Sequence, residues 1–125
     1  MDKQVEKNRK FSRSLFHAIE GIVTVVKEER NMKAHVCIAS VTLFISYLSG
    51  LTAMEWCFIL MCIFLVFVME MMNTVVENLV DLVVKKEYHI EAKKAKDIAA
   101  GGVLLSACFT VIIAVIIILP KWIHF

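Results

Sequence analysis

Residues 98–120 read IAAGGVLLSACFTVIIAVIIILP, a run of 23 residues without a charged side chain. About 20 apolar residues in a helix are enough to cross the hydrocarbon core of a bilayer, which is roughly 30 Å thick. A second run, residues 34–54, holds 21 residues without a formal charge between Lys33 and Glu55. These two runs predict an integral membrane protein built from helices.

The composition of the whole chain agrees with that prediction. Of its 125 residues 59% are hydrophobic, whereas soluble domains average about 45–50%. The four cysteines lie inside apolar stretches without a C-x-x-C spacing, so we interpret them as packing residues. These features exclude a soluble domain, a disulfide scaffold and a nucleic-acid-binding arm. A chain this short cannot enclose a large cavity, so a site must be shallow, interfacial or shared between subunits.

The segment before the first apolar run has the period of an amphipathic helix. Phe11, Leu15 and Ile19 recur at four-residue steps, while Lys10 and His17 lie on the opposite side. We therefore predict a helix over 11–30 that lies in the membrane interface with its basic residues toward the headgroups. A helix that faces another subunit is an alternative, and the two are compatible.

Three crossings are predicted within a single membrane domain of residues 1–125: 33–51, 55–83 and 97–120. The second is the longest, because residues 56–84 would form a helix of about 43 Å that projects beyond the hydrocarbon into the cytosol.

The distribution of basic residues predicts the orientation. Thirteen of the 14 Lys and Arg residues lie either before the first crossing or between residues 85 and 96. By the positive-inside rule, the N-terminus and the 84–97 loop are cytoplasmic and the C-terminus is outside. We expect a multi-pass protein of the cytoplasmic membrane.

The second crossing carries an acidic stripe within VMEMMNTVVENLVD, residues 68–81. Glu70, Asn73, Glu77 and Asp81 fall within an arc of about 80° on one helix face. Ionisable groups at membrane depth are costly and usually functional. Glu70 lies about 21 Å along the helix from Trp56, and Glu77 about 10 Å further toward the cytosol. The stripe therefore runs from lipid depth to water.

This gradient favours chemistry between a lipid headgroup and a water-soluble reagent. Glu70 could accept a proton from a lipid hydroxyl, and Glu77 with a second carboxylate could hold Mg²⁺. Two other interpretations stay open on spacing alone. The stripe could be a polar seam that joins subunits, with Asn73 as its main contact, or Glu70 could be the embedded carboxylate of a small proton-coupled transporter.

The segment KKEYHIEAKKAKD, residues 85–97, mixes lysines with acids beside the third crossing. A solvated charge run is its default interpretation, although Lys96 lies where it could neutralise phosphates. No Walker motif or kinase glycine loop is present, so helix side chains and loop backbone must hold any nucleotide. The small residues 99–102 would let helices approach closely and bring Lys96 and Asp97 near Glu77.

These residues resemble the small prokaryotic diacylglycerol kinase family, and most closely its Gram-positive branch, the undecaprenol kinases. The resemblance rests on EMMNTVVENLVD at 70–81, EYH at 87–89, AKKAKD at 92–97, AAGG at 99–102 and ERN at 29–31. It covers the chain from about Phe11 to Pro120.

The resemblance implies a homotrimer of three-helix subunits with a surface helix and shared active sites. Glu70 is then the general base for the lipid hydroxyl, and Glu29 and Glu77 bind Mg²⁺. The implied ATP contacts are Lys10, His17, Glu29, Glu77, Glu87, Tyr88, His89, Lys96 and Asp97. Asn73 and Asp81 support the site, and Glu70 and Ala100 contact the lipid substrate.

Two departures separate the chain from the Gram-negative branch. Lys10 replaces an arginine that contacts phosphate, and His35 replaces a glutamate. Since His17 and His35 resemble the undecaprenol kinase pattern, we expect an ATP- and Mg²⁺-dependent kinase that converts undecaprenol to undecaprenyl phosphate. Diacylglycerol is the alternative substrate. A transporter would leave Glu29, Glu77 and the Lys96–Asp97 pair unexplained.

Overall fold

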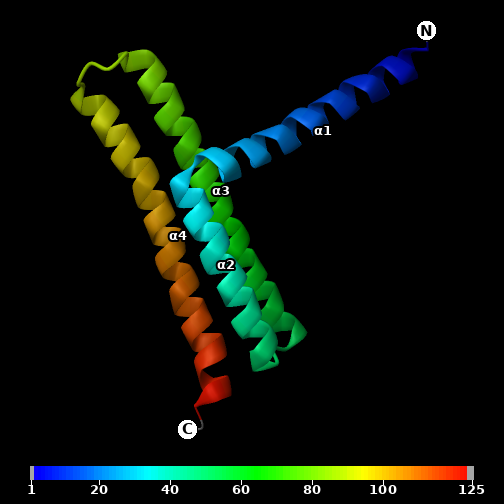
Figure 1. Ribbon diagram of the computed structural model, residues 1–125, viewed down its shortest axis with the longest axis vertical. Coiled ribbons are helices and arrows are strands. Elements are labelled where there is room, and N and C mark those ends of the chain that lie inside the picture. Colours follow the sequence, from blue (N-terminus) through cyan, green and yellow to red (C-terminus); the bar gives the residue numbers. More distant parts are fainter. Residues whose placement is uncertain (1, 124–125) are drawn as a thin grey trace.

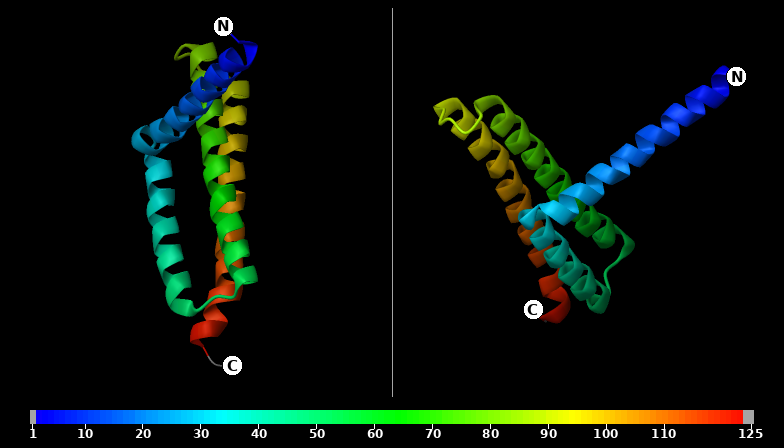
Figure 2. Two further views of the ribbon diagram at one scale, coloured as in Figure 1. Left: turned by 90° about the vertical axis from the view of Figure 1, so that its right-hand side faces the viewer. Right: turned by 45° about the horizontal axis from the view of Figure 1, so that its top comes forward.

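The computed structural model describes residues 2–123, and every regular element in that range is an α-helix (Figure 1). The helices are α1 (Lys3–Glu28), α2 (Arg30–Ser49), α3 (Ala53–Val84) and α4 (Ile90–Trp122). Helices α2, α3 and α4 lie side by side, while α1 leaves the bundle at a steep angle (Figures 1 and 2). The all-α prediction is confirmed, and α2, α3 and α4 are each long and apolar enough to cross a membrane.

The first helix begins earlier than the predicted start at residue 11. Asp2 is its N-cap and accepts a hydrogen bond from the backbone N–H of Gln4 at 3.3 Å, so the polar residues that follow are helical from Lys3 onward. A single extended residue, Glu29, separates α1 from α2. The direction of the chain therefore changes sharply at Glu29.

The α2–α3 turn is closed by local polar contacts. Gly50 takes the left-handed conformation with φ 65°, which suits glycine, at the end of α2. Thr52 and Glu55 then form a capping box, with bonds of 3.3 and 3.0 Å between each side chain and the other's backbone N–H. Two residues near the end of α4 reach this turn: Lys121 pairs with Glu55 at 3.1 Å, and Trp122 Nε1 donates to Ser49 at 2.7 Å.

The predicted loop over 84–97 is much shorter in the structure. Residues 85–89 connect α3 to α4, and α4 begins at Ile90 instead of at 97. Ala92 and Ala95 favour the helix, and Lys93 pairs with Asp97 one turn later at 2.5 Å. The basic segment is therefore mostly the first turns of a helix.

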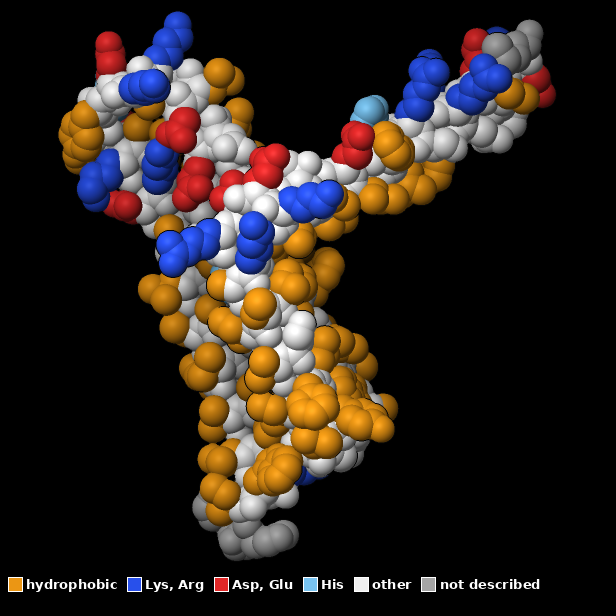
Figure 3. Space-filling view, in the orientation of Figure 1, with side chains coloured by type: hydrophobic (Ala, Val, Ile, Leu, Met, Phe, Trp, Pro, Cys, Tyr) orange, Lys and Arg blue, Asp and Glu red, His pale blue; other side chains and the backbone are white. Residues whose placement is uncertain are grey.

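The buried core is a narrow seam. On α3 the buried residues recur at three- and four-residue steps along one face: Ile59, Cys62, Val66, Glu70, Asn73 and Thr74. On α2 they are spaced seven apart, at Met32, Ala39 and Ser46. Elsewhere large apolar side chains are exposed, and Figure 3 shows them over the lower part of the bundle and along one side of α1. An apolar surface of this extent requires lipid or another protein against it.

Small residues allow the close approach of α3 and α4 at one of the predicted positions. A Cβ atom on Gly102 would collide with Met69 Cε, whereas one on Gly101 would meet open space. Gly102 is therefore the glycine that contacts α3.

Candidate functional site

The acidic stripe of α3 runs from the core to the surface. Glu70 is 1% exposed and Asn73 3%, Glu77 is half-buried, and Asp81 is exposed. The four residues share one helix face, as their spacing predicts, but their surroundings change from apolar to aqueous within three turns.

Glu70 lies at the contact between α2 and α3. Its Oε2 is 3.4 Å from Nε2 of His35, and its backbone carbonyl accepts a hydrogen bond from the Thr74 hydroxyl at 3.0 Å. Burying a carboxyl group is costly unless a polar partner contacts it. His35, whose side chain is 18% exposed, is that partner.

Asn73 and Glu77 form the next contact along the stripe. Asn73 Nδ2 donates to Glu77 Oε1 at 3.3 Å, and Asn73 Oδ1 is buried without a hydrogen-bond partner among residues 2–123. Buried polar atoms are nearly always paired. The described residues therefore leave one polar atom beside the half-buried Glu77 carboxylate without a partner.

Glu29 stands at the corner between α1 and α2. It lines a cavity of about 290 Å³ together with Thr74 and Asn78 of α3 and residues from the last turns of α1. Glu77 is not among the lining residues. Within residues 2–123, no three His, Cys, Asp or Glu side chains converge as a metal site.

Near the C-terminal end of α3, charged side chains of α3 and α4 form an ion pair. Lys96 Nζ is 2.5 Å from Asp81 Oδ1. Lys96 was expected near Glu77, and the carboxylate with which it pairs is that of Asp81, one turn further along α3. Glu87 and His89 lie 3.6 Å apart in the connection.

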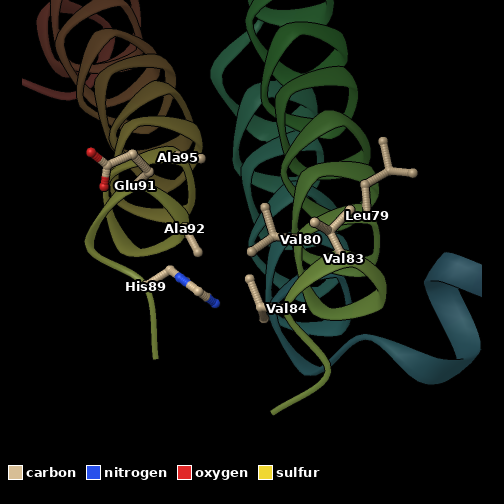
Figure 4. Close-up of a pocket in the computed structure, with 8 residues that line it drawn as sticks. All are labelled: Leu79, Val80, Val83, Val84, His89, Glu91, Ala92 and Ala95. Atoms are coloured by element: carbon tan, nitrogen blue, oxygen red, sulfur yellow. The ribbon is translucent and has the colours of Figure 1, made fainter. Parts of the chain in front are cut away.

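Five of the predicted ATP contacts line one cavity of about 360 Å³: Glu87, Tyr88, His89, Lys96 and Asp97. A second, largely apolar hollow of about 450 Å³ adjoins it and shares four lining residues. In Figure 4, Val80 and Val84 of α3 face Ala92 and the His89 ring across this hollow, and the Glu91 carboxylate points away. The region could hold an anionic ligand that also has an apolar part.

The remaining predicted residues lie elsewhere in the chain. Lys10 and His17 are exposed on α1, which extends away from the α3–α4 connection (Figure 2), and His17 pairs with Glu20 at 3.1 Å. Ala100 is exposed on α4. A single chain therefore does not bring Lys10 and His17 to the acidic stripe.

Sequence reasoning did not identify Thr74 and Asn78 as site residues. The helical period could have indicated them, because Thr74 follows Glu70 by four residues and Asn78 follows Thr74 by four, which puts all three near one helix face. The contact between His35 and Glu70 had no such signal, since it joins two helices.

Comparison with known proteins gives consistent matches along the chain. The profile of the family described as "Prokaryotic diacylglycerol kinase" matches residues 16–118. Undecaprenol kinase from Bacillus subtilis (strain 168) is 40% identical over 120 residues, which is 96% of each chain. A diacylglycerol kinase from a Synechocystis species is 35% identical over 107 residues, 86% of this chain and 61% of the relative. One from Helicobacter pylori is 28% identical over 105 residues, 84% of this chain and 81% of the relative.

Proposed function

Because the chain belongs to the prokaryotic diacylglycerol kinase family, we propose that it transfers the γ-phosphoryl group of ATP to the terminal hydroxyl of undecaprenol. The protein is a lipid kinase and a membrane protein, with three helices apolar enough to span a bilayer. The polyprenol substrate is supported by the Bacillus subtilis relative, which is named undecaprenol kinase and matches along 96% of both chains.

The single observation that carries this function is the burial gradient along α3. Glu70 is buried beside His35 among apolar side chains, while Asp81 and Lys96 meet beside the charged cavity at the α3–α4 connection. From Glu70 to Asp81 the helix rises about 16 Å. One helix face can therefore join a hydroxyl at the membrane to a nucleotide in water.

In this proposal α1 and the α3–α4 connection lie on the cytoplasmic side and the C-terminus lies outside, which the distribution of basic residues supports through the positive-inside rule. We also propose that α1 lies in the membrane interface, which is supported by Phe11, Leu15 and Ile19 being more than half exposed. His124 and Phe125, which complete the predicted outer tail, lie outside the described residues.

Phosphoryl transfer depends mainly on positioning and on neutralising charge. In this proposal the Glu70 carboxylate drives removal of the proton from the lipid hydroxyl. Lys96 places positive charge at the cavity that takes the ATP phosphates, and Asp81 orients Lys96. Asn73 holds the Glu77 carboxylate in place.

The donors around Glu77 fit Mg²⁺. This ion prefers oxygen ligands and takes one or two carboxylates with phosphates and water. Glu77 would supply one carboxylate, and the buried Asn73 Oδ1 lies unpaired beside it. Glu29, which lines the cavity beside Thr74 and Asn78 without Glu77, would supply the second carboxylate when the ion binds. When bound there, Mg²⁺ would neutralise charge on the ATP phosphates.

We also propose a homotrimer with active sites shared between subunits. Two observations support it: the apolar surface of α2–α4 is largely exposed in one chain, and Lys10 and His17 are remote from the acidic stripe of their own chain. A neighbouring α1 would complete the site.

The test is a phosphorylation assay with purified protein, Mg²⁺–ATP and either undecaprenol or diacylglycerol. The wild-type chain should phosphorylate undecaprenol, and Glu70→Gln should lose turnover by about 10²-fold or more while its KM for ATP stays within a few-fold. Product from diacylglycerol in preference to undecaprenol would refute the polyprenol substrate alone. Absence of product from both lipids would refute the proposed kinase activity and would favour the transporter interpretation.

A further inference from the structure

His35 stands between Glu70 and an apolar groove. The groove lies among α2, α3 and α4, has a volume of about 170 Å³, and is lined by His35, Ile38, Ala39, Thr42, Ile63, Val66, Phe67, Ala107, Thr110, Val111 and Ala114. His35 is the one ionisable side chain in that lining. Glu70 is not part of the wall, yet its Oε2 lies 3.4 Å from His35 Nε2. The buried carboxylate therefore meets the groove through the imidazole.

The groove continues toward the far end of the bundle. A second hollow of about 580 Å³ shares Thr42, Val111 and Ala114 with it and extends to Leu48 and Trp122. From His35 to Leu48, α2 rises about 20 Å. None of the residues in either lining carries a formal charge. This surface suits one long hydrocarbon chain whose hydroxyl ends at His35.

We propose that His35 is the group that takes the proton from the alcohol, and that Glu70 acts through it. The inference rests on the proposed kinase function and specifies how its base works. As the alcohol oxygen forms its bond to the γ-phosphorus, its proton passes to Nδ1 of His35. The bond between the γ-phosphorus and the bridging oxygen breaks, ADP leaves with that electron pair, and the imidazolium later releases its proton to water.

The pairing with Glu70 accounts for this role of the imidazole. A carboxylate facing Nε2 favours the tautomer with the proton on Nε2, which leaves the lone pair on Nδ1 free to accept. The same negative charge stabilises the imidazolium that forms. The separation of 3.4 Å is longer than a catalytic hydrogen bond of about 2.6–3.2 Å, and in this proposal it shortens when the substrate binds.

No other ionisable group in the described wall competes for the imidazole. The groove residues of α3 are Ile63, Val66 and Phe67, and those of α4 are alanine, threonine and valine. Glu70 is the one acidic residue that pairs with His35 among residues 2–123. Glu70 itself does not line the groove, so in this proposal it acts on the alcohol through His35.

His35→Gln separates the two roles. A glutamine amide can still donate to Glu70 but cannot accept a proton. If His35 is the base, kcat for undecaprenol falls about 10²-fold or more, as in Glu70→Gln, while the KM for ATP stays within a few-fold. The double variant is no slower than either single one, because the two residues act as a unit. Retention of kcat in His35→Gln within about tenfold of wild type would overturn the proposal.

Chemical rescue distinguishes a His35 that accepts the proton from a His35 that has only a structural role. His35→Ala leaves space for added imidazole, which should raise its kcat at least several-fold but should not raise that of Glu70→Gln. A His35→Ala enzyme that is slow and unaffected by imidazole would count against the relay. Ser40→Ala is the control on the same helix: it removes an exposed hydroxyl bonded to Val36 and should keep wild-type kcat.

Failure of this inference is distinguishable from failure of the proposed function. A wild-type enzyme that phosphorylates undecaprenol alongside a fully active His35→Gln refutes only the role of His35. A wild-type enzyme that phosphorylates no lipid refutes the kinase.

Discussion

At the scale of single residues, a contact between two helices sets the position of the Lys96 ammonium. Its ammonium reaches across from α4 to Asp81 of α3, although the side chains are 39% and 62% exposed. Exposed ion pairs add little to stability. The pair is therefore better explained by the charge that it places at the wall of the α3–α4 cavity, which Lys96 lines.

Lys96→Gln should raise the KM for Mg²⁺–ATP about tenfold or more, because one charge-assisted contact to phosphate is lost. Its melting temperature should change little. Lys94→Gln is the matched control, since it removes the same charge from an exposed neighbour that does not line the cavity. Steady-state kinetics over a range of ATP concentrations decides this. Equal effects of both substitutions would assign the change to net charge and not to Lys96.

At the scale of elements, the contact between α3 and α4 places the charged pair. Gly102 of α4 lets the two helices approach each other at Met69 of α3. Gly102 follows Lys96 on α4 by somewhat more than one and a half turns. Because Met69 Cε is the end of a flexible side chain, a methyl group at position 102 can be accommodated, but a branched side chain would push the helices apart.

Gly102→Leu should therefore lower stability by about 1–3 kcal/mol through overpacking and raise the KM for Mg²⁺–ATP by displacing Lys96 from Asp81. Gly102→Ala should stay close to wild type, and Gly101→Ala, which meets open space, should be neutral or slightly stabilising. Denaturation in detergent together with ATP kinetics measures both effects. Normal kinetics in Gly102→Leu would show that the cavity does not need this helix contact.

At the scale of the whole molecule, the proposed active site needs residues from more than one chain. Lys10 and His17 project on α1 while the acidic stripe remains in the bundle, and most large apolar side chains of α2–α4 are exposed. Symmetric assembly would complete the site and cover part of this surface.

Mixed assemblies test whether sites are shared. Chains carrying Lys10→Ala with His17→Ala should be inactive alone, as should chains carrying Glu70→Gln. Co-assembly of equal amounts of the two chains should restore activity to at most about a quarter of wild type. Under random mixing, that is the share of interfaces at which one chain supplies an intact α1 and its neighbour an intact acidic stripe. A mixture of Glu70→Gln and Glu77→Gln, whose residues share one helix, should remain inactive. No recovery in the first mixture would place the complete site within one chain.

The sequence by itself determined the helices and the chemistry on each helix face. Long apolar runs leave helix as the way to satisfy the backbone in lipid, and the 3.6-residue period puts Glu70, Asn73, Glu77 and Asp81 on one side of α3. Helix ends were less predictable. The Asp2 cap extended α1 to before its predicted start at residue 11, and the alanines after Ile90 extended α4 into the predicted loop.

Only the tertiary structure decided which residues meet between helices. Periodicity places a side chain on a face but does not specify which residue of another helix lies opposite, because that depends on helix crossing and axial register. Hence the pairing of Lys96 with Asp81 emerged only from the packing of α4 on α3, and the position of His35 against Glu70 only from the packing of α2 on α3. The charges that first appeared as a stripe and a basic segment become a path from an apolar groove to a charged cavity because three helices pack around them.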